Sequence, residues 1–213
     1  MSGDTEEIRF DAAGEAALWA RLPDGAPPGA AFRWAAALEK APGVHRVDPG
    51  PGGLMLLPAP GAALREVKAA ARRAYRQVES DPPGAEHELE VSFAPRWAPD
   101  LPQVAARAGL DVAEVVRRLV AGRYRVDALG FLPGFPYLLG LDPRLWIPRR
   151  PEARTRVPEG SLGIGGRYLG VYPRAAPGGF HLVGRTDRPL FDPGAWPPCP
   201  LAPGDSVRLR EAR

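Results

Sequence analysis

Residues 130–141 read GFLPGFPYLLGL, an almost wholly apolar stretch that two prolines and three glycines divide. Proline removes a backbone donor and glycine gives up side-chain packing, so both weaken a helix or an inner strand. The stretch therefore predicts an irregular backbone that carries Phe131, Phe135 and Tyr137. Two interpretations are open: a bent piece of core, or a wall shaped for something to lie against.

On the C-terminal side of this stretch, helical periodicity is lost. Short apolar runs separated by Gly and Pro follow one another, namely GSLGIGG, YLGVYP, FHLVGRT and SVRLRE. Such spacing is typical of an all-β barrel or sandwich. On its N-terminal side lie two short predicted helices with Asp100 and Asp111 at their N-caps, and Glu114 is placed for a reciprocal capping interaction.

The N-terminal half alternates strand-like and helical segments. Strands are expected in 8–14, 15–23, 43–50 and 52–60, helices in 27–43 and 61–80, and a last strand in HELEVSFAP (87–95). The order β-β-α-β-β-α-β predicts an α+β domain with both helices on one sheet face. We therefore expect a small ββαββα-type domain over residues 1–93. Residues 94–213 would form the β-rich domain, with the helical pair at its entry.

Composition excludes several classes of protein. The chain has 213 residues and a net charge of +3, and no apolar run approaches the roughly 18 residues of a membrane span. The acidic, polar N-terminus is unlike a secretory signal, so a cytoplasmic protein is expected. A single Cys199 and scattered histidines predict no disulfide and no metal site. The lack of Asn and the 27 prolines fit a thermophilic source, and high-GC coding would give the same bias.

VAARAGLDVAEVVRRLVAG (104–122) has the helix-turn-helix pattern of some DNA-binding proteins, which would place Arg117 and Arg118 in a groove. Against this, the second helix devotes its best face to Val112, Val115, Val116, Leu119 and Val120, which predicts core. We therefore favour a packed helical connector and expect no nucleic-acid partner.

Other candidate motifs have ordinary structural interpretations. GIGGRYLG (163–170) lacks the lysine and following helix of a phosphate loop, and two strands joined by a glycine turn explain it better. Asp192 and Asp205 lie where Asp commonly makes turns. Ser161 is not in a nucleophile elbow. Arg185, in an apolar strand-like run, is either a structural ion-pair residue or a clamp for a carboxylate or phosphate.

Five segments occur in an order that resembles one known family: GFLPGFPYLLGLDPRL, VPEGSLGIGG, GVYPRAAPGGFHLVGRT, LFDP and LAPGDSVRL. The family is that of the 5-oxoprolinase B subunit, also called allophanate hydrolase subunit 1, which includes the sporulation-kinase inhibitor KipI. The resemblance is strongest from about Tyr124 to Arg210. It implies that the second domain is a cyclophilin-like β-barrel.

The resemblance also implies a function and partners. Family members act with a homologous C subunit, and with a third polypeptide, the A subunit, they open the lactam of 5-oxoproline using ATP. ATP, together with magnesium, would be held jointly with the partner, and the substrate is a small molecule. A membrane partner is not expected. The alternative that the KipI resemblance leaves open is a regulatory module that inhibits a sensor histidine kinase.

Motif matching carries nine positions over as site or interface residues, without a catalytic role for any of them. They are Pro133, Gly134, Phe135, Tyr137, Ser161, Tyr172, Gly178, Arg185 and Thr186. We expect the Pro133–Tyr137 segment and Arg185 to line one cleft shared with the partner.

The chain departs from the usual family pattern at four places. The family often has His at Leu119, Gln-Thr at Tyr168 and Leu169, Trp at Phe180, and a Gly-Gly-Glu run ending at Arg96. Tyr168 has a much larger apolar area than glutamine, and the Leu169 side chain forms no hydrogen bond. Two interpretations are open: a diverged member with another substrate, or one whose role is binding.

Overall fold

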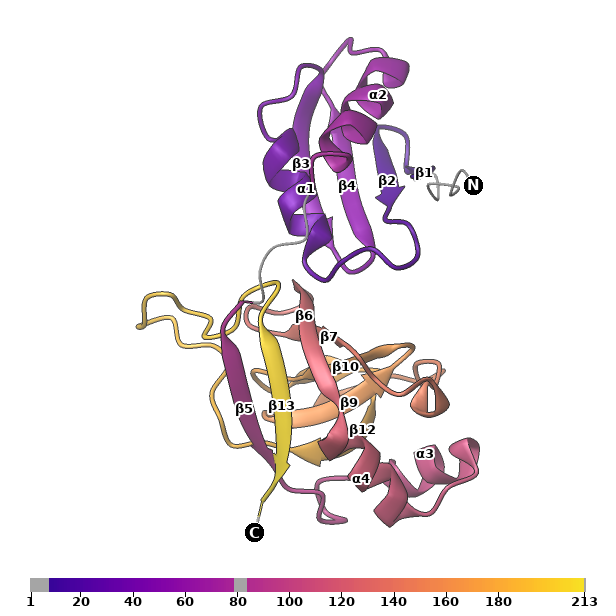
Figure 1. Ribbon diagram of the computed structural model, residues 1–213, viewed down its shortest axis with the longest axis vertical. Coiled ribbons are helices and arrows are strands. Elements are labelled where there is room, and N and C mark those ends of the chain that lie inside the picture. Colours follow the sequence, from indigo (N-terminus) through magenta and orange to yellow (C-terminus); the bar gives the residue numbers. More distant parts are fainter. Residues whose placement is uncertain (1–7, 79–83, 213) are drawn as a thin grey trace. The chain divides into compact units, whose positions relative to one another are not determined.

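The computed structural model describes residues 8–78 and 84–212. It divides into two compact units, one on each side of the boundary between residues 82 and 83 (Figure 1). Among the described residues, no helix is long and apolar enough to cross a membrane.

The N-terminal unit is an antiparallel four-stranded sheet with the order β1-β2-β4-β3, packed against two helices. The buried ring of Trp34 lies between these helices, and its Nε1 donates to the backbone oxygen of Ala71 at 2.8 Å. Residues 79–80 of the predicted second helix lie outside the described residues. The elements are β1 (Arg9–Ala13), β2 (Ala17–Arg21), α1 (Ala30–Leu38), β3 (Val44–Gly50), β4 (Gly53–Pro58) and α2 (Leu64–Tyr75).

The second unit is built on a curled seven-stranded sheet with the order β12-β9-β10-β7-β6-β13-β5 (Figure 1). Strands β11 and β8 form a separate two-stranded sheet. Its helices and strands are β5 (Glu86–Val91), α3 (Leu101–Ala108), α4 (Val112–Ala121), β6 (Arg123–Leu129), β7 (Pro136–Leu139), the 3-10 helix η1 (Pro143–Leu145), β8 (Arg154–Val157), β9 (Ser161–Gly165), β10 (Tyr168–Val171), β11 (Ala176–Gly178), β12 (His181–Arg185) and β13 (Ser206–Glu211).

The expectation that HELEVSFAP completes the N-terminal sheet is wrong. This segment forms β5, which pairs in parallel with β13 from the other end of the chain, with Leu89 opposite Leu209. Both leucines are buried in the core of the second unit. The alternation of β5 correctly signals a half-buried strand, but alternation does not identify which sheet buries it. The units consequently divide at residues 82 and 83, and not near residue 93.

The two edge strands of the curled sheet meet at one point. Ser92, which directly follows β5, forms an antiparallel bridge with Arg185 at the end of β12. Each backbone N–H donates to the other residue's carbonyl, at 2.7 and 2.9 Å. The bridge gives both edges a hydrogen-bonding partner at this point and brings Arg185 beside the end of β5.

The helical pair is only partly core. Val115 and Leu119 of α4 are buried with α3 against the sheet. Val112, however, is 40% exposed. Val116 and Val120 are half-buried and line a groove of about 850 Å³ with Phe93. The prediction that all five apolar residues of this stripe are core is therefore confirmed for Val115 and Leu119 and wrong for Val112. Val116 is half-buried and packs against the core, and Val120 is half-buried.

Candidate functional site

The stretch 130–141 makes a tight turn and then enters β7. Gly134, at φ +81°, lies so close to the Leu190 carbonyl that an added Cβ would be 2.3 Å from that oxygen. Only glycine fits this position, because it tolerates positive φ and has no Cβ. The stretch is thus irregular at its start, as predicted, and becomes a strand at Pro136.

Six rings from this stretch and its neighbours form a continuous aromatic cluster. The rings of Phe135 and Tyr137 are 5.0 Å apart, and that of Tyr172 lies 5.2 Å from Phe135. The contacts are edge-to-face, the arrangement that aromatic quadrupoles prefer. The aromatic cluster consists of Phe131, Phe135, Tyr137, Tyr168, Tyr172 and Phe180.

Glycines beneath these rings explain the composition of β9 and β10. A Cβ at Gly165 would be 2.4 Å from the ring of Phe180, and one at Gly170 would be 2.6 Å from that of Phe135. The intervening residues, such as Ile164, point into the main core on the opposite face. The glycine-rich segment 163–170 therefore consists of two antiparallel strands joined at Gly166, and aromatic rings pack against its glycines. It is not a phosphate loop.

Most of the aromatic cluster is buried. Phe135 and Tyr172 are each 1% exposed, whereas Phe131 is 57% exposed. The burial supports a bent piece of core for part of the stretch, and a wall against which something lies stays a prediction. Phe135 and Tyr137 belong to a bent piece of core, and Phe131 faces solvent on top of it.

The backbone at Phe131 is strained. Its φ of +68° is the only positive value at a non-glycine among the described residues. The N–H of Leu132 donates to the carbonyl of Gly130 at 2.8 Å, which closes a three-residue γ-turn around Phe131. A γ-turn with positive φ is rare, and a bulky side chain makes it costlier.

A buried carboxylate lies at the Tyr168 end of the cluster. The Tyr168 hydroxyl donates to Asp127 Oδ2 at 2.9 Å, and Asp127 is only 3% exposed. Burial, together with the charge of Asp127, raises the pKa of Tyr168 to about 12. The Arg167 guanidinium lies over the Tyr168 ring and donates to its hydroxyl at 3.4 Å. Asp127 was missed at the sequence level, because an isolated Asp in a strand gives no motif.

Arg149 lies at the other end of the cluster, with its guanidinium 5.3 Å from the centre of the Phe180 ring. Burial raises the pKa of Tyr137, and the charge of Arg149 opposes this rise. Burial also raises the pKa of Tyr172, and a backbone hydrogen bond with Phe180 opposes the rise more than the charge of Arg149 does. The cluster therefore keeps its tyrosines protonated, as hydrogen-bond donors, at neutral pH.

Asp100 is the centre of a set of polar contacts in the second unit. Its side chain accepts the Leu182 backbone N–H at 2.6 Å and Arg154 at 2.7 Å, with Arg150 at 3.4 Å. It does not cap α3 as predicted, although it occupies the N-cap position. His181 donates through Nε2 to the Pro148 carbonyl at 3.0 Å when that nitrogen carries the proton, and burial lowers its pKa.

Arg185 lies apart from the aromatic cluster. Its guanidinium stacks on Trp97, 4.1 Å from the ring centre, and pairs with the exposed Asp187 at 3.4 Å. With Thr186 it lines a polar pocket of about 500 Å³, which Glu88 and Glu90 also border. The polar pocket is joined to the aromatic cluster through the backbone, because the Thr186 N–H donates to the Gly160 carbonyl at 2.9 Å and the Gly160 N–H donates to the Tyr172 carbonyl at 2.8 Å.

The other predicted positions are Ser161, Gly178 and Pro133. The Ser161 carbonyl accepts the Tyr172 N–H at 3.0 Å, and Ser161 pairs with Arg185 across β9 and β12. Gly178 lies under the Tyr172 hydroxyl, where an added Cβ would be 2.2 Å from that oxygen. Pro133 is exposed in the turn that precedes β7. The predicted residues thus lie partly in the aromatic cluster and partly at the polar pocket, and a single cleft lined by both stays a prediction.

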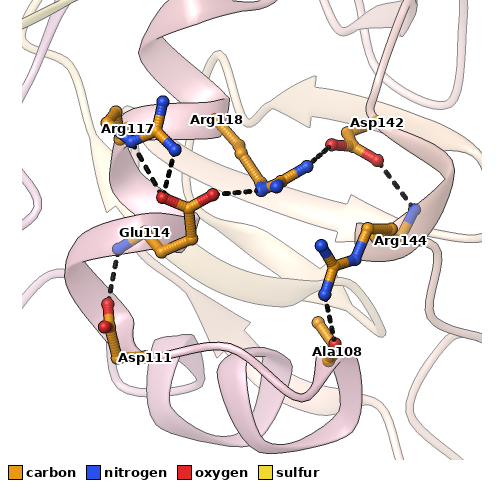
Figure 2. A network of polar contacts seen from close by, with 7 residues as sticks. All are labelled: Ala108, Asp111, Glu114, Arg117, Arg118, Asp142 and Arg144. Carbon is orange, nitrogen blue, oxygen red and sulfur yellow. Dashed lines mark hydrogen bonds and ion pairs between the residues drawn. The ribbon is translucent and has the colours of Figure 1, made fainter.

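An ion-pair network fastens the helical pair to η1 (Figure 2). Asp111 accepts the Glu114 N–H at 2.7 Å, as predicted for the N-cap of α4. The Glu114 side chain does not complete the capping interaction, but pairs with Arg117 and Arg118 instead. Arg118 also donates to the Asp142 carboxylate. The hydrogen bond from the Arg144 N–H and the contact with Arg118 lower the pKa of Asp142. Both arginines of the helix-turn-helix pattern therefore have acidic partners within the chain.

The remaining candidates are structural turns. Asp205 accepts the N–H groups of Ala85 and Ala202 and contacts His87 at 2.9 Å. Asp192 accepts the Gly194 N–H at 2.9 Å. Over residues 8–78 and 84–212, no three His, Cys, Asp or Glu side chains are grouped to hold a metal ion.

Comparison with known proteins gives a consistent family. The family model of the carboxyltransferase domain, subdomains C and D, matches residues 8–201. The 5-oxoprolinase B subunit of Escherichia coli O157:H7 is 50% identical over 122 residues, which cover 57% of this chain and 56% of that protein. The protein of the same name from Bacillus subtilis (strain 168) is 42% identical over 122 residues, covering 57% of this chain and 51% of that protein. The chain thus matches about half the length of these relatives.

Solved structures agree. The protein TTHA0988 has a TM-score of 0.71 and 34% identity over 92% of this chain and 40% of its own. PH0987 from Pyrococcus horikoshii, described as a conserved uncharacterized protein, has a TM-score of 0.59 and 31% identity, and 96% of this chain matches 97% of it. The urea amidolyase of K. lactis is 20% identical, with a TM-score of 0.78. The match covers 100% of this chain and 15% of the amidolyase, and the two share the mixed α+β fold.

Proposed function

The chain belongs to the family of the carboxyltransferase domain, subdomains C and D, and its relatives include proteins named as the B subunit of 5-oxoprolinase. From this we infer that it is one subunit of an ATP-dependent 5-oxoprolinase, a lactam hydrolase, and acts with a homologous C subunit and with the A subunit. The observation that carries the proposal is the aromatic cluster, because the segments that resemble the family's motifs build it.

The chemistry of the cluster suits a small amide-containing substrate. We propose that the Tyr137 and Tyr172 hydroxyls, which are buried in this chain alone, become donors for a carbonyl or carboxylate once the complex forms, and that Asp127, which accepts the Tyr168 hydroxyl, becomes an acceptor for an N–H group. Arg149 adds positive charge at the same end as Phe180. A cyclic amide with a carboxylate has both kinds of group. We place the substrate near these residues, at the boundary with the partner.

The polar pocket has little free positive charge for the phosphates of ATP. The arginines of the polar pocket are already engaged: Arg210 with Glu88 and Glu90, Arg185 with Asp187, and Arg188 with the Glu88 carbonyl. A phosphate would have to compete with these acceptors. We therefore propose that ATP and its magnesium ion are bound jointly with, or wholly by, the partner subunits.

We also propose that the curled sheet is a cyclophilin-like barrel. The Ser92–Arg185 bridge between its edge strands supports closure. The ββαββα order of the N-terminal unit supports the domain type expected from the sequence.

Reconstitution tests the function. The chain should co-purify with a co-expressed homologue of the C subunit, and addition of the A subunit should give 5-oxoproline-dependent ATP hydrolysis with release of glutamate. The control is the same mixture without this chain. No complex and no activity above that control would refute the proposal, whereas inhibition of a sensor histidine kinase by the isolated chain would favour the regulatory alternative.

A further inference from the structure

The Gly130–Pro133 turn presents apolar side chains to solvent. Phe131 is 57% exposed, Pro133 is exposed and Leu132 is half-buried. No charged residue interrupts the three. Aromatic residues are enriched at protein–protein interfaces relative to the rest of the surface.

The turn holds the Phe131 ring outward at a cost. The bulky residue adopts φ +68° in a γ-turn, although folding alone would be served better by glycine there. Strained backbone persists where the surroundings determine it, and it is concentrated at functional positions. The strain alone assigns no partner, but it shows that the Phe131 ring is not placed there by backbone preference.

The ring is also rigidly supported. It lies edge-on to Phe135 at 5.4 Å and to Tyr172 at 6.1 Å, and both of these rings are 1% exposed. A ring held in place before binding loses little freedom when it is buried by a partner, which is what an anchor residue requires. Trp196 differs: it is 94% exposed and makes no ring contact within the described part of the chain.

We propose that Phe131 is the anchor of a protein–protein interface, and that its ring inserts into an apolar pocket on the homologous C subunit. This deepens the proposed function and rests on it. A second polypeptide chain is favoured because the relatives are named as one subunit of an enzyme. The turn is exposed and apolar, and the polar pocket and the groove described above are lined by other residues.

Phe131→Gly separates anchoring from folding. Glycine accepts φ +68° without strain, so the loss of ring contacts is offset and the melting temperature should stay within a few degrees of the wild type. Affinity for a purified homologue of the C subunit, measured by calorimetry, should fall at least tenfold. Trp196→Gly removes a more exposed ring and should leave affinity unchanged. Phe131→Asn, which also tolerates positive φ, gives a second variant with the same expectation.

Each outcome decides the proposal. Unchanged affinity in folded Phe131→Gly or Phe131→Asn overturns it while the proposed function stands. A wild-type chain that does not bind the homologue of the C subunit overturns the proposed function and the anchor together. Self-association of the wild type that disappears in Phe131→Gly, with binding to that homologue unaffected, would assign the ring to a second copy of this chain and overturn the proposal as stated.

Discussion

Replacement of Asp100 should destabilise the second unit more than replacement of a residue in an exposed ion pair would. Its side chain accepts the buried Leu182 N–H and Arg154, and Arg150 lies at 3.4 Å. In Asp100→Ala the amide loses its acceptor, which costs about 1–3 kcal/mol. The charge that opposes Arg154 is also lost.

The free energy lost with the Asp100–Arg154 ion pair lies between two limits. Breaking a fully buried ion pair costs about 3–5 kcal/mol, and an exposed pair contributes about 0–1 kcal/mol. Asp100 is 7% exposed but Arg154 is 25% exposed, so we take about 1–2 kcal/mol after screening by solvent. The sum predicts a loss of about 3 kcal/mol for Asp100→Ala. Asp100→Asn keeps an acceptor for the amide and should lose about 1–2 kcal/mol.

Urea unfolding of the whole chain, together with hydrogen exchange at the Leu182 amide, checks this. Asp111→Ala is the matched control, because it removes an exposed N-cap worth about 1 kcal/mol and leaves Leu182 untouched. A loss below about 1 kcal/mol for Asp100→Ala, or a Leu182 amide that exchanges as slowly as in the wild type, would refute the reasoning.

Three further predictions concern single side chains. Tyr168→Phe leaves the buried Asp127 carboxylate without its hydroxyl donor, so urea unfolding should show a loss of about 1–3 kcal/mol, and the ultraviolet titration should lose one tyrosine near pH 12. His181 has its pKa lowered by folding, so the unfolded state binds the extra proton. Stability is therefore fully present above pH 6.5 and falls as pH drops below it, and His181→Gln should flatten this part of the profile. Arg185→Lys loses the planar stack on Trp97, and denaturant unfolding should show about 0.5–1 kcal/mol less stability; an unchanged value would argue against a structural role.

The sequence was most informative where a residue type has a single physical explanation. Helical periodicity located α1, α2 and α4, and the Asp111 N-cap was placed correctly because its geometry is local. The partner of β5 was not predictable, since a parallel strand pair between residues 86–91 and 206–211 leaves no local signal. The same applies to Asp100, whose local role as a cap is replaced by the distant Leu182 amide.

For the apolar stripe of α4, the sequence predicted more buried residues than the structure has. Its five apolar residues span an arc wider than the sheet and α3 together cover, so Val115 and Leu119 are buried and Val112 is not. Periodicity reports which side of a helix is apolar, but not how much of that side has something to pack against. Among the site residues, Arg185 was assigned to the aromatic segment by motif matching and by its need for an acceptor, whereas in the fold it stacks on Trp97 and borders the polar pocket.

The glycines of β9 and β10 connect the fold with the proposed anchor. A side chain at Gly170 would lift the ring of Phe135 off the sheet, since an added Cβ would lie 2.6 Å from it. Phe131 rests edge-on on that ring, so its position depends on a residue that never touches it. Gly170→Ala should therefore displace the Phe131 ring by moving Phe135, whereas Phe131→Gly removes the ring itself. Two such different changes should weaken the same contact only if Phe131 is held by the packed rings beneath it and not by the turn alone.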